Sequence, residues 1–166
     1  MSRLRTTLRG DGSLPIGEAL HPVTIAAVLL LFLNDWVLKA AFPHGWPHAV
    51  TGKLSDIAGL AAAPVILTAL TGLLLLLSGK LGLRTSHGPH LTQRRLVLAI
   101  AATGICFCAV KLSPAASHAF VALLSHVRHS AVMLDRSDLF CLPALGLAYF
   151  VGRDEIRAAT ASQNAE

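Results

Sequence analysis

The stretch Thr51-Gly52-Lys53-Leu54-Ser55-Asp56-Ile57-Ala58-Gly59-Leu60 decides the fold, because it places a lysine and an aspartate at the mouth of an apolar run that continues to Leu77. A membrane-spanning helix needs about 20 apolar residues, and this run has that length. Charged groups are costly inside a membrane and are retained there for pairing or for function. A shorter version of the pattern recurs at Arg136-Ser137-Asp138-Leu139-Phe140-Cys141-Leu142. The sequence therefore predicts a membrane protein with a polar site.

The overall composition agrees with one membrane domain. Hydrophobic residues make up 54% of the 166 residues and charged residues only 14%, with a mean hydropathy of +0.61. Soluble globular proteins contain about 25% charged residues. The three cysteines, Cys106, Cys108 and Cys141, lie in apolar runs without zinc-type spacing, so we interpret them as packing residues.

Apolar stretches within residues 21–152 predict an all-α integral membrane four-helix bundle. The first three spans are expected at about Pro22–Phe42, Lys53–Leu77 and Leu96–Leu112. Residues 1–20 form a polar N-terminus without a convincing signal-peptide cleavage site. Residues 153–166 are polar and alanine-rich, and we expect a disordered tail.

The distribution of basic residues predicts the orientation in the membrane. Nine of the 14 basic residues lie in the N-terminus, the middle loop and the tail: Arg3, Arg5, Arg9, Lys80, Arg84, Arg94, Arg95, Arg153 and Arg157. Five lie on the opposite side, inside or beside the spans: Lys39, Lys53, Lys111, Arg128 and Arg136. The positive-inside rule then places both termini in the cytoplasm of a plasma (inner) membrane protein. The net charge of +5 reflects this topology, and no nucleic-acid partner is expected.

The fourth span is short. Asp138 to Val151 contains 14 residues, about 21 Å of α-helix against a hydrocarbon core of about 30 Å. A half-span, a locally thin membrane or a helix that begins near Ser130 would each resolve the deficit. We expect the earlier start, because residues 131–134 are apolar.

A short amphipathic helix is expected at the outer interface before the fourth span. Apolar residues between Pro114 and Leu134 follow the helical i, i+3, i+4, i+7 spacing, with histidines and serine largely on the other face. The same segment could instead extend the third span beyond a proline kink.

The two predicted helical hairpins share a pattern that fits an internal repeat. Each has a lysine and then a proline near the outer end of its first helix, and Ser-Asp near the start of its second: Lys39, Pro43, Ser55 and Asp56; Lys111, Pro114, Ser137 and Asp138. Duplication of a hairpin explains this pattern. Convergence also explains it, since serine and aspartate both favour helix starts.

Eight charged residues are expected at the same outer level of the membrane: Asp35, Lys39, Lys53, Asp56, Lys111, Asp135, Arg136 and Asp138. A lone charge at the centre of a span costs about 2.5–3.5 kcal/mol. We therefore predict that Lys39, Asp56, Lys111 and Asp138 converge, each beside an opposite charge. The pairs either fix helix register, with lysines reaching out to the interface, or line an outward-facing pocket for a charged head group or small solute.

No metal site, cofactor or catalytic nucleophile is predicted. Five histidines are expected on the outer side, but they lack a metal-binding motif: His44, His48, His118, His126 and His129. Ser55 and Ser137 lack a base with triad spacing, so we interpret them as helix-capping residues.

The residues Leu33-Asn34-Asp35, Leu38-Lys39 and Thr51 to Leu60 resemble those of uncharacterised bacterial four-span membrane proteins. The layout is more distantly similar to VanZ-like proteins, small membrane proteins linked to glycopeptide-antibiotic tolerance. That family has an acidic-basic motif opening the second span and an Arg/Asp motif opening the fourth, and Lys53 and Asp138 are the matching residues. Here the usual Asp-Lys pair is Gly52-Lys53, and the Asn and Gly expected after the acid are Pro143 and Gly146.

The preferred function is a non-enzymatic multi-pass membrane protein whose outer Lys/Asp pocket binds an anionic lipid head group or a small polar ligand. One alternative is a membrane enzyme acting on a lipid-linked phosphate, with Asp56 or Asp138 as base and lysines as charge clamps. Another is a structural subunit of a membrane complex. The expected partners are membrane lipids, a second copy of the chain or another membrane protein.

Overall fold

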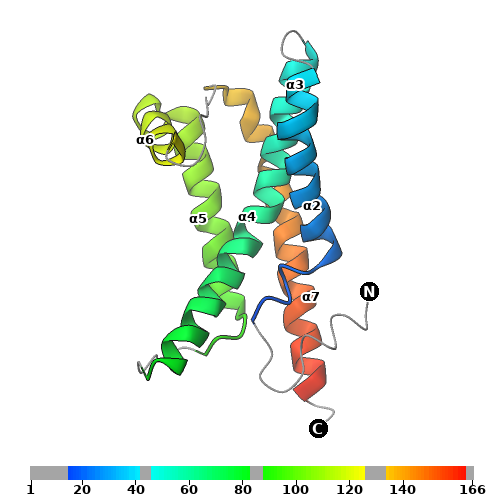
Figure 1. The fold of residues 1–166 in the computed structure, drawn as a ribbon, viewed down its shortest axis with the longest axis vertical. Coiled ribbons are helices and arrows are strands. Elements are labelled where there is room, and N and C mark those ends of the chain that lie inside the picture. The colour runs from blue at the N-terminus through cyan, green and yellow to red at the C-terminus, as the bar shows by residue number, and fades with distance from the viewer. Residues whose placement is uncertain (1–14, 42–45, 83–87, 126–133, 164–166) are drawn as a thin grey trace.

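The computed structural model describes residues 15–41, 46–82, 88–125 and 134–163 (Figure 1). Every regular element in these ranges is helical, and no strand occurs among them. The all-α prediction is therefore confirmed for the described part of the chain.

The first span is a continuous helical segment of three parts: α2 (Pro22–Leu33), the π-helical η1 (Asn34–Leu38) and α3 (Lys39–Ala41). Pro22 occupies the first turn, where its missing N–H costs nothing, and the His21 side chain caps the helix by accepting a hydrogen bond from the N–H of Val23 at 3.2 Å. The wider turn of η1 re-aims the side chains that follow it. This span agrees with the predicted one.

Helix α4 (Trp46–Lys80) is 35 residues long and packs against α2, α5, α7 and η2, so it is the central element of the fold (Figure 1). The prediction that this helix begins at Lys53 is wrong. Pro47 was interpreted as part of a turn, but proline also fits the first turn of a helix. As a result, Lys53, Ser55 and Asp56 lie in the helix interior, about two turns from its start.

Helices α5 (Gln93–Leu112) and α6 (Pro114–Ser125) are separated by Ser113, whose backbone is extended. The side chain of Thr92 caps α5 by accepting a hydrogen bond from the N–H of Arg95. Figure 1 shows α6 turning away from the axis of α5. A short helix therefore follows α5 as a separate element, and its amphipathic character and interfacial position stay predictions.

The last helical segment consists of the 3-10 helix η2 (Arg136–Ala144) followed by α7 (Leu145–Gln163). The prediction placed the start of this helix near Ser130. Residues 126–133 lie outside the described residues, but Leu134 and Asp135 are not helical, so the prediction is wrong for these two residues. Asp135 has an extended backbone, and its carboxylate accepts the N–H of Ser137, which fixes the helix start one residue later. The tail, expected to be disordered, continues α7 as a helix to Gln163.

Among the described residues, three helical segments are long and apolar enough to cross a membrane: Pro22–Ala41, Val50–Lys80 and Gln93–Leu112. Many of their large apolar side chains are exposed, among them Leu29, Leu98 and Ile105. Such broad apolar surfaces are unusual for soluble monomers and fit a lipid environment.

The buried contacts between helices are made mainly by small residues. They include Ala27 on α2, Ala61, Ala62 and Val65 on α4, and Ala148 and Val151 on α7. Small side chains let helices approach closely, which is how membrane helices associate when burial of apolar surface from water contributes little.

Two ends of the bundle can be distinguished in Figure 1. The upper end contains α3, α6 and η2, and the lower end contains the end of α4, the start of α5 and the end of α7. Basic residues in lower-end elements are Lys80, Arg94, Arg95, Arg153 and Arg157. Those nearer the upper end are Lys39, Lys53, Lys111 and Arg136. This separation matches the two groups on which the predicted orientation rests.

Candidate functional site

A chain of alternating charges joins α4, α5 and η2 near the upper end. The ammonium group of Lys111 contacts Asp56 Oδ2 at 2.8 Å and Asp138 Oδ2 at 2.5 Å. The other carboxylate oxygen of Asp138 accepts a hydrogen bond from Lys53 at 3.0 Å. We call Lys53, Asp56, Lys111, Asp135 and Asp138 the upper ionic network.

The inner half of this network is closed. The side chains of Lys111 and Asp138 are only 10% and 9% exposed. The ammonium of Lys111 also lies 5.6 Å from the centre of the Phe107 ring, a distance at which the ring face attracts a cation. A charge shielded in this way depends on its partners, so these contacts hold α5 and η2 in register.

The outer half is open. The side chain of Lys53 is 39% exposed and that of Asp135 is 50% exposed, and their charged atoms lie 3.7 Å apart. Lys53 also donates to Ser137 Oγ at 2.5 Å, and Ser137 Oγ donates to Asp135 Oδ2 at 2.8 Å. A cation, a hydroxyl and an anion therefore lie side by side at the surface.

A second charged group lies between the first span and α4. Asp35 pairs with Lys39 at 2.7 Å and accepts a hydrogen bond from Ser55 Oγ at 2.8 Å. Its neighbour Asn34 is fully buried and donates from Nδ2 to the carbonyl oxygen of Thr51 at 2.8 Å. The η1 turn places both side chains against α4, and it thereby connects the first span to the stretch from Thr51 to Leu60.

Seven of the eight predicted site residues take part in these contacts, and they form two groups. Of the four residues predicted to converge, Asp56, Lys111 and Asp138 meet. Lys39 does not join them, because Asp35 lies one helical turn away and already neutralises it. Arg136 is exposed, and no described carboxylate lies within ion-pair distance of it.

The capping interpretation of the two serines is wrong. Ser55 lies inside α4 and donates to Asp35 across two helices. Ser137 lies in η2 and connects Lys53 to Asp135, and it is Asp135 that caps η2.

The two lysines of the predicted internal repeat pair differently. Lys39 pairs with a carboxylate of its own helical segment, whereas Lys111 pairs with carboxylates of other helices. The internal repeat therefore stays a hypothesis without support from these contacts.

Sequence reasoning missed a polar cluster at the lower end. Glu18 is 3% exposed, and its carbonyl accepts a hydrogen bond from Thr24 Oγ1 at 3.0 Å. Burial raises the pKa of the Glu18 carboxyl above its ordinary value of 4.5, and the nearby Glu155 adds to this effect. His21 Nε2 lies 3.4 Å from Asp154 Oδ2. The sequence signal was weak, because the segment before α2 contains turn residues and no helical periodicity.

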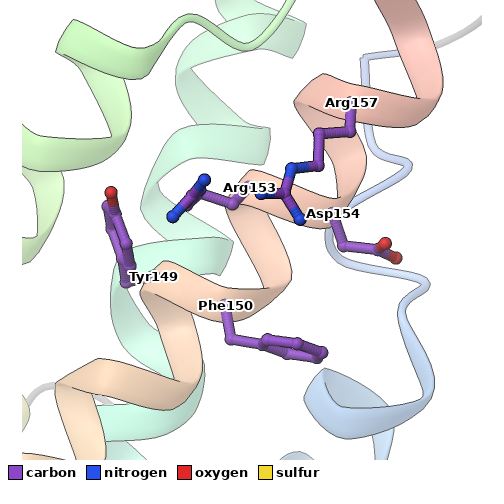
Figure 2. A pocket seen from close by; sticks show the side chains of 5 residues that line it. All are labelled: Tyr149, Phe150, Arg153, Asp154 and Arg157. Carbon is purple, nitrogen blue, oxygen red and sulfur yellow. The ribbon is translucent and has the colours of Figure 1, made fainter. Parts of the chain in front are cut away.

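A small open pocket of about 140 Å³ lies beside α7 at the lower end. Tyr149, Phe150, Arg153, Asp154 and Arg157 line it, and Figure 2 shows Arg157 extending back along α7 toward Arg153. The guanidinium carbon of Arg153 lies 5.6 Å from the centre of the Tyr149 ring. The pocket is smaller than the roughly 300–1,000 Å³ of typical small-molecule sites, so it fits one chemical group and not a whole ligand.

Within the described ranges, no three side chains of the His, Cys, Asp and Glu types come together in a way that could hold a metal ion. His44, His126 and His129 lie outside the described residues, and so does the position of the His48 side chain. His118 is exposed on α6.

Comparison of the chain with protein-family models, curated proteins and solved structures finds no match in any of the three. The likeness to VanZ-like proteins therefore rests on the sequence motifs alone.

Proposed function

We propose that the chain is a four-span protein of the plasma membrane with both termini in the cytoplasm, and that its upper ionic network binds a polar lipid head group at the outer surface. The basic residues of the lower-end elements support this orientation by the positive-inside rule. The open side of the network would then face the outer leaflet.

The observation that carries the proposal is the pair of Lys53 and Asp135. A buried ion pair such as Lys111 and Asp138 is strongly destabilising when one partner is removed, so it can hold two helices together. Lys53 and Asp135 are instead substantially exposed, and at 3.7 Å their contact is loose enough for a ligand to compete for each.

The charges of the network limit which ligands can bind. Two lysines face three aspartates, so a bare anion would meet a net negative site. A head group that carries both signs fits better: its phosphate would pair with Lys53 and Ser137, and its ammonium group with Asp135. Phosphatidylethanolamine has this chemistry, and we take a zwitterionic head group as the preferred ligand.

The enzymatic alternative has less support. Both carboxylate oxygens of Asp138 already contact ammonium groups, one of Lys53 and one of Lys111, so neither is free to accept a substrate proton. Asp56 is engaged by Lys111. Each predicted base is therefore already paired with an ammonium group of the network.

Native mass spectrometry of the detergent-purified chain with added phosphatidylethanolamine tests this proposal. Lys53→Gln and Asp135→Asn should each weaken binding about ten-fold or more, because each removes a charge-assisted hydrogen bond. Lys39→Gln removes one lysine from the neighbouring Asp35 group and serves as the matched control, with binding unchanged. Wild-type binding by both Lys53→Gln and Asp135→Asn would reduce the network to a structural role.

A further inference from the structure

The pocket beside α7 marks a change in the character of that helix. Residues 145–152 are apolar, with Phe150 exposed, and charged residues begin at Arg153. Tyrosine and tryptophan side chains favour the level where hydrocarbon meets the polar head groups. Tyr149, beside this change from apolar to charged residues, therefore favours a position of the pocket near the membrane surface of the lower end.

Within the described part of the chain, the two arginines of this pocket have no acidic partner. Arg153 and Arg157 are four residues apart on α7, so both lie on one helix face, and both are exposed. Among the described residues, no carboxylate lies within ion-pair distance of either guanidinium group, since Asp154 instead contacts His21. The Asp154 carboxylate also lines this pocket of about 140 Å³ but contacts His21, so the two guanidinium groups can together accept an anion the size of a single chemical group.

We propose that Arg153 and Arg157 bind the phosphate of an anionic membrane lipid, with Tyr149 and Phe150 beside the upper part of its acyl chains. Guanidinium groups match phosphate oxygens in pairs, and the Tyr149 ring orients Arg153 through the contact at 5.6 Å. A lipid fits better than a soluble phosphate, because the aromatic side chains of Tyr149 and Phe150 line the same pocket as the arginines (Figure 2). This site is separate from the upper ionic network. It prefers an anionic head group, whereas the network prefers a zwitterionic one.

Titration of the detergent-purified chain with phosphatidylglycerol, followed by native mass spectrometry, tests the proposal. Removing one cation near an anionic head group weakens binding about five-fold, so Arg153→Gln/Arg157→Gln should lose about 25-fold in affinity. Each single variant should lose about five-fold, which keeps the test valid if the double variant is unstable. Phosphatidylethanolamine binding should not change, which separates this outcome from that of the upper network.

Lys80→Gln/Arg94→Gln is the matched control, because it removes two exposed cations at the same end but outside the pocket. It should bind phosphatidylglycerol like the wild type. The proposal is overturned if the pocket variant keeps wild-type affinity, or if the control loses as much. It is also overturned if inorganic phosphate binds as tightly as phosphatidylglycerol, since the site would then take a soluble anion.

Discussion

The ammonium nitrogen of Lys111 lies 2.5 Å from Oδ2 of Asp138, although the two residues are 27 positions apart and belong to α5 and η2. Both side chains are nearly inaccessible to solvent. Removing one partner of a buried ion pair leaves a charge without compensation, whereas removing both charges is much less harmful. The upper ionic network therefore makes the stability of the bundle depend on the balance of its charges.

We predict that Lys111→Met lowers the free energy of unfolding by about 3–5 kcal/mol, because Asp56 would lose its ammonium partner and Asp138 would keep only Lys53. Adding Asp56→Asn should recover part of this loss, since the contact between Lys53 and Asp138 would remain. Thermal and denaturant unfolding in detergent micelles measures both effects. Lys39→Met, in a half-exposed pair, should cost no more than about 1 kcal/mol. A double variant less stable than Lys111→Met alone would contradict this account.

Two glycines of α7 should respond differently to alanine. A Cβ atom at Gly152 would overlap the side chain of Leu96, whereas one at Gly146 meets nothing within 4 Å. We predict that Gly152→Ala destabilises the bundle by about 1–3 kcal/mol through overpacking between α5 and α7. Gly146→Ala should be neutral or stabilising by up to about 1 kcal/mol, because alanine favours helix more than glycine does. Melting temperatures in micelles compare the two, and equal effects would refute the close approach of Leu96.

The sequence predicted those features that a single strong physical effect determines. Long apolar runs predicted the three helices that are long and apolar enough to cross a membrane, because such runs are rare outside membrane-spanning helices. The cost of burying charge predicted that Asp56, Lys111 and Asp138 would meet, although they are distant in sequence. The pairing of Asp35 with Lys39 followed from helical spacing alone.

Features that depend on the local backbone conformation were not predicted. The fourth span looked too short because an α-helix was assumed, but η2 is a 3-10 helix of nine residues. A 3-10 helix rises about 2.0 Å per residue and an α-helix about 1.5 Å, so η2 with residues 145–152 covers about 30 Å. If this segment crosses the membrane, as we propose, the longer rise of η2 supplies the missing length without an earlier helix start.

The burial of Glu18 was not predicted for a different reason. It lies before the first helix, in a segment whose burial depends on α4 and α7 folding against it, and sequence periodicity carries no information about such contacts. A Cβ atom at Gly17 would overlap the carboxylate of Glu155, so this glycine permits the close approach of the segment to α7.

Glu18→Gln should change the pH dependence of stability. Burial raises the pKa of Glu18 in the folded state above 4.5, while the nearby Thr68 hydroxyl and Arg95 oppose that shift. Below pH 4.5 the carboxyl is protonated in both states. As the pH rises from 4.5 through the raised pKa, the unfolded state loses its proton first, and the folded state loses relative stability. Glutamine cannot ionise, so the variant should match the wild type near pH 4 and exceed it at pH 8.

Melting temperatures of both proteins at pH 4, 6 and 8 give this comparison, and the difference between the two curves removes the contribution of all other titrating groups. A variant that is less stable than the wild type at pH 8 would show that the ionised carboxylate is itself stabilising, contrary to the cost of its burial.

The last prediction concerns the path of the chain through the membrane. In a background without Cys106, Cys108 and Cys141, single cysteines replace Arg136 at the upper end, His90 near the start of α5 and Phe140 on η2. All three native side chains are exposed, Phe140 at 87%. In intact cells an impermeant maleimide should label the cysteine at position 136, and the one at position 90 only after permeabilisation, because the lower end is expected in the cytoplasm.

The cysteine at position 140 decides whether η2 enters the bilayer. A side chain facing lipid has little contact with water, and the thiolate that reacts with maleimide does not form readily in an apolar surrounding. We therefore expect slow labelling at position 140 before and after permeabilisation. Labelling there as fast as at position 136 would mean that η2 lies in water, and a reversed pattern at positions 136 and 90 would invert the orientation. Either result would remove the outer leaflet from the environment of Lys53 and Asp135.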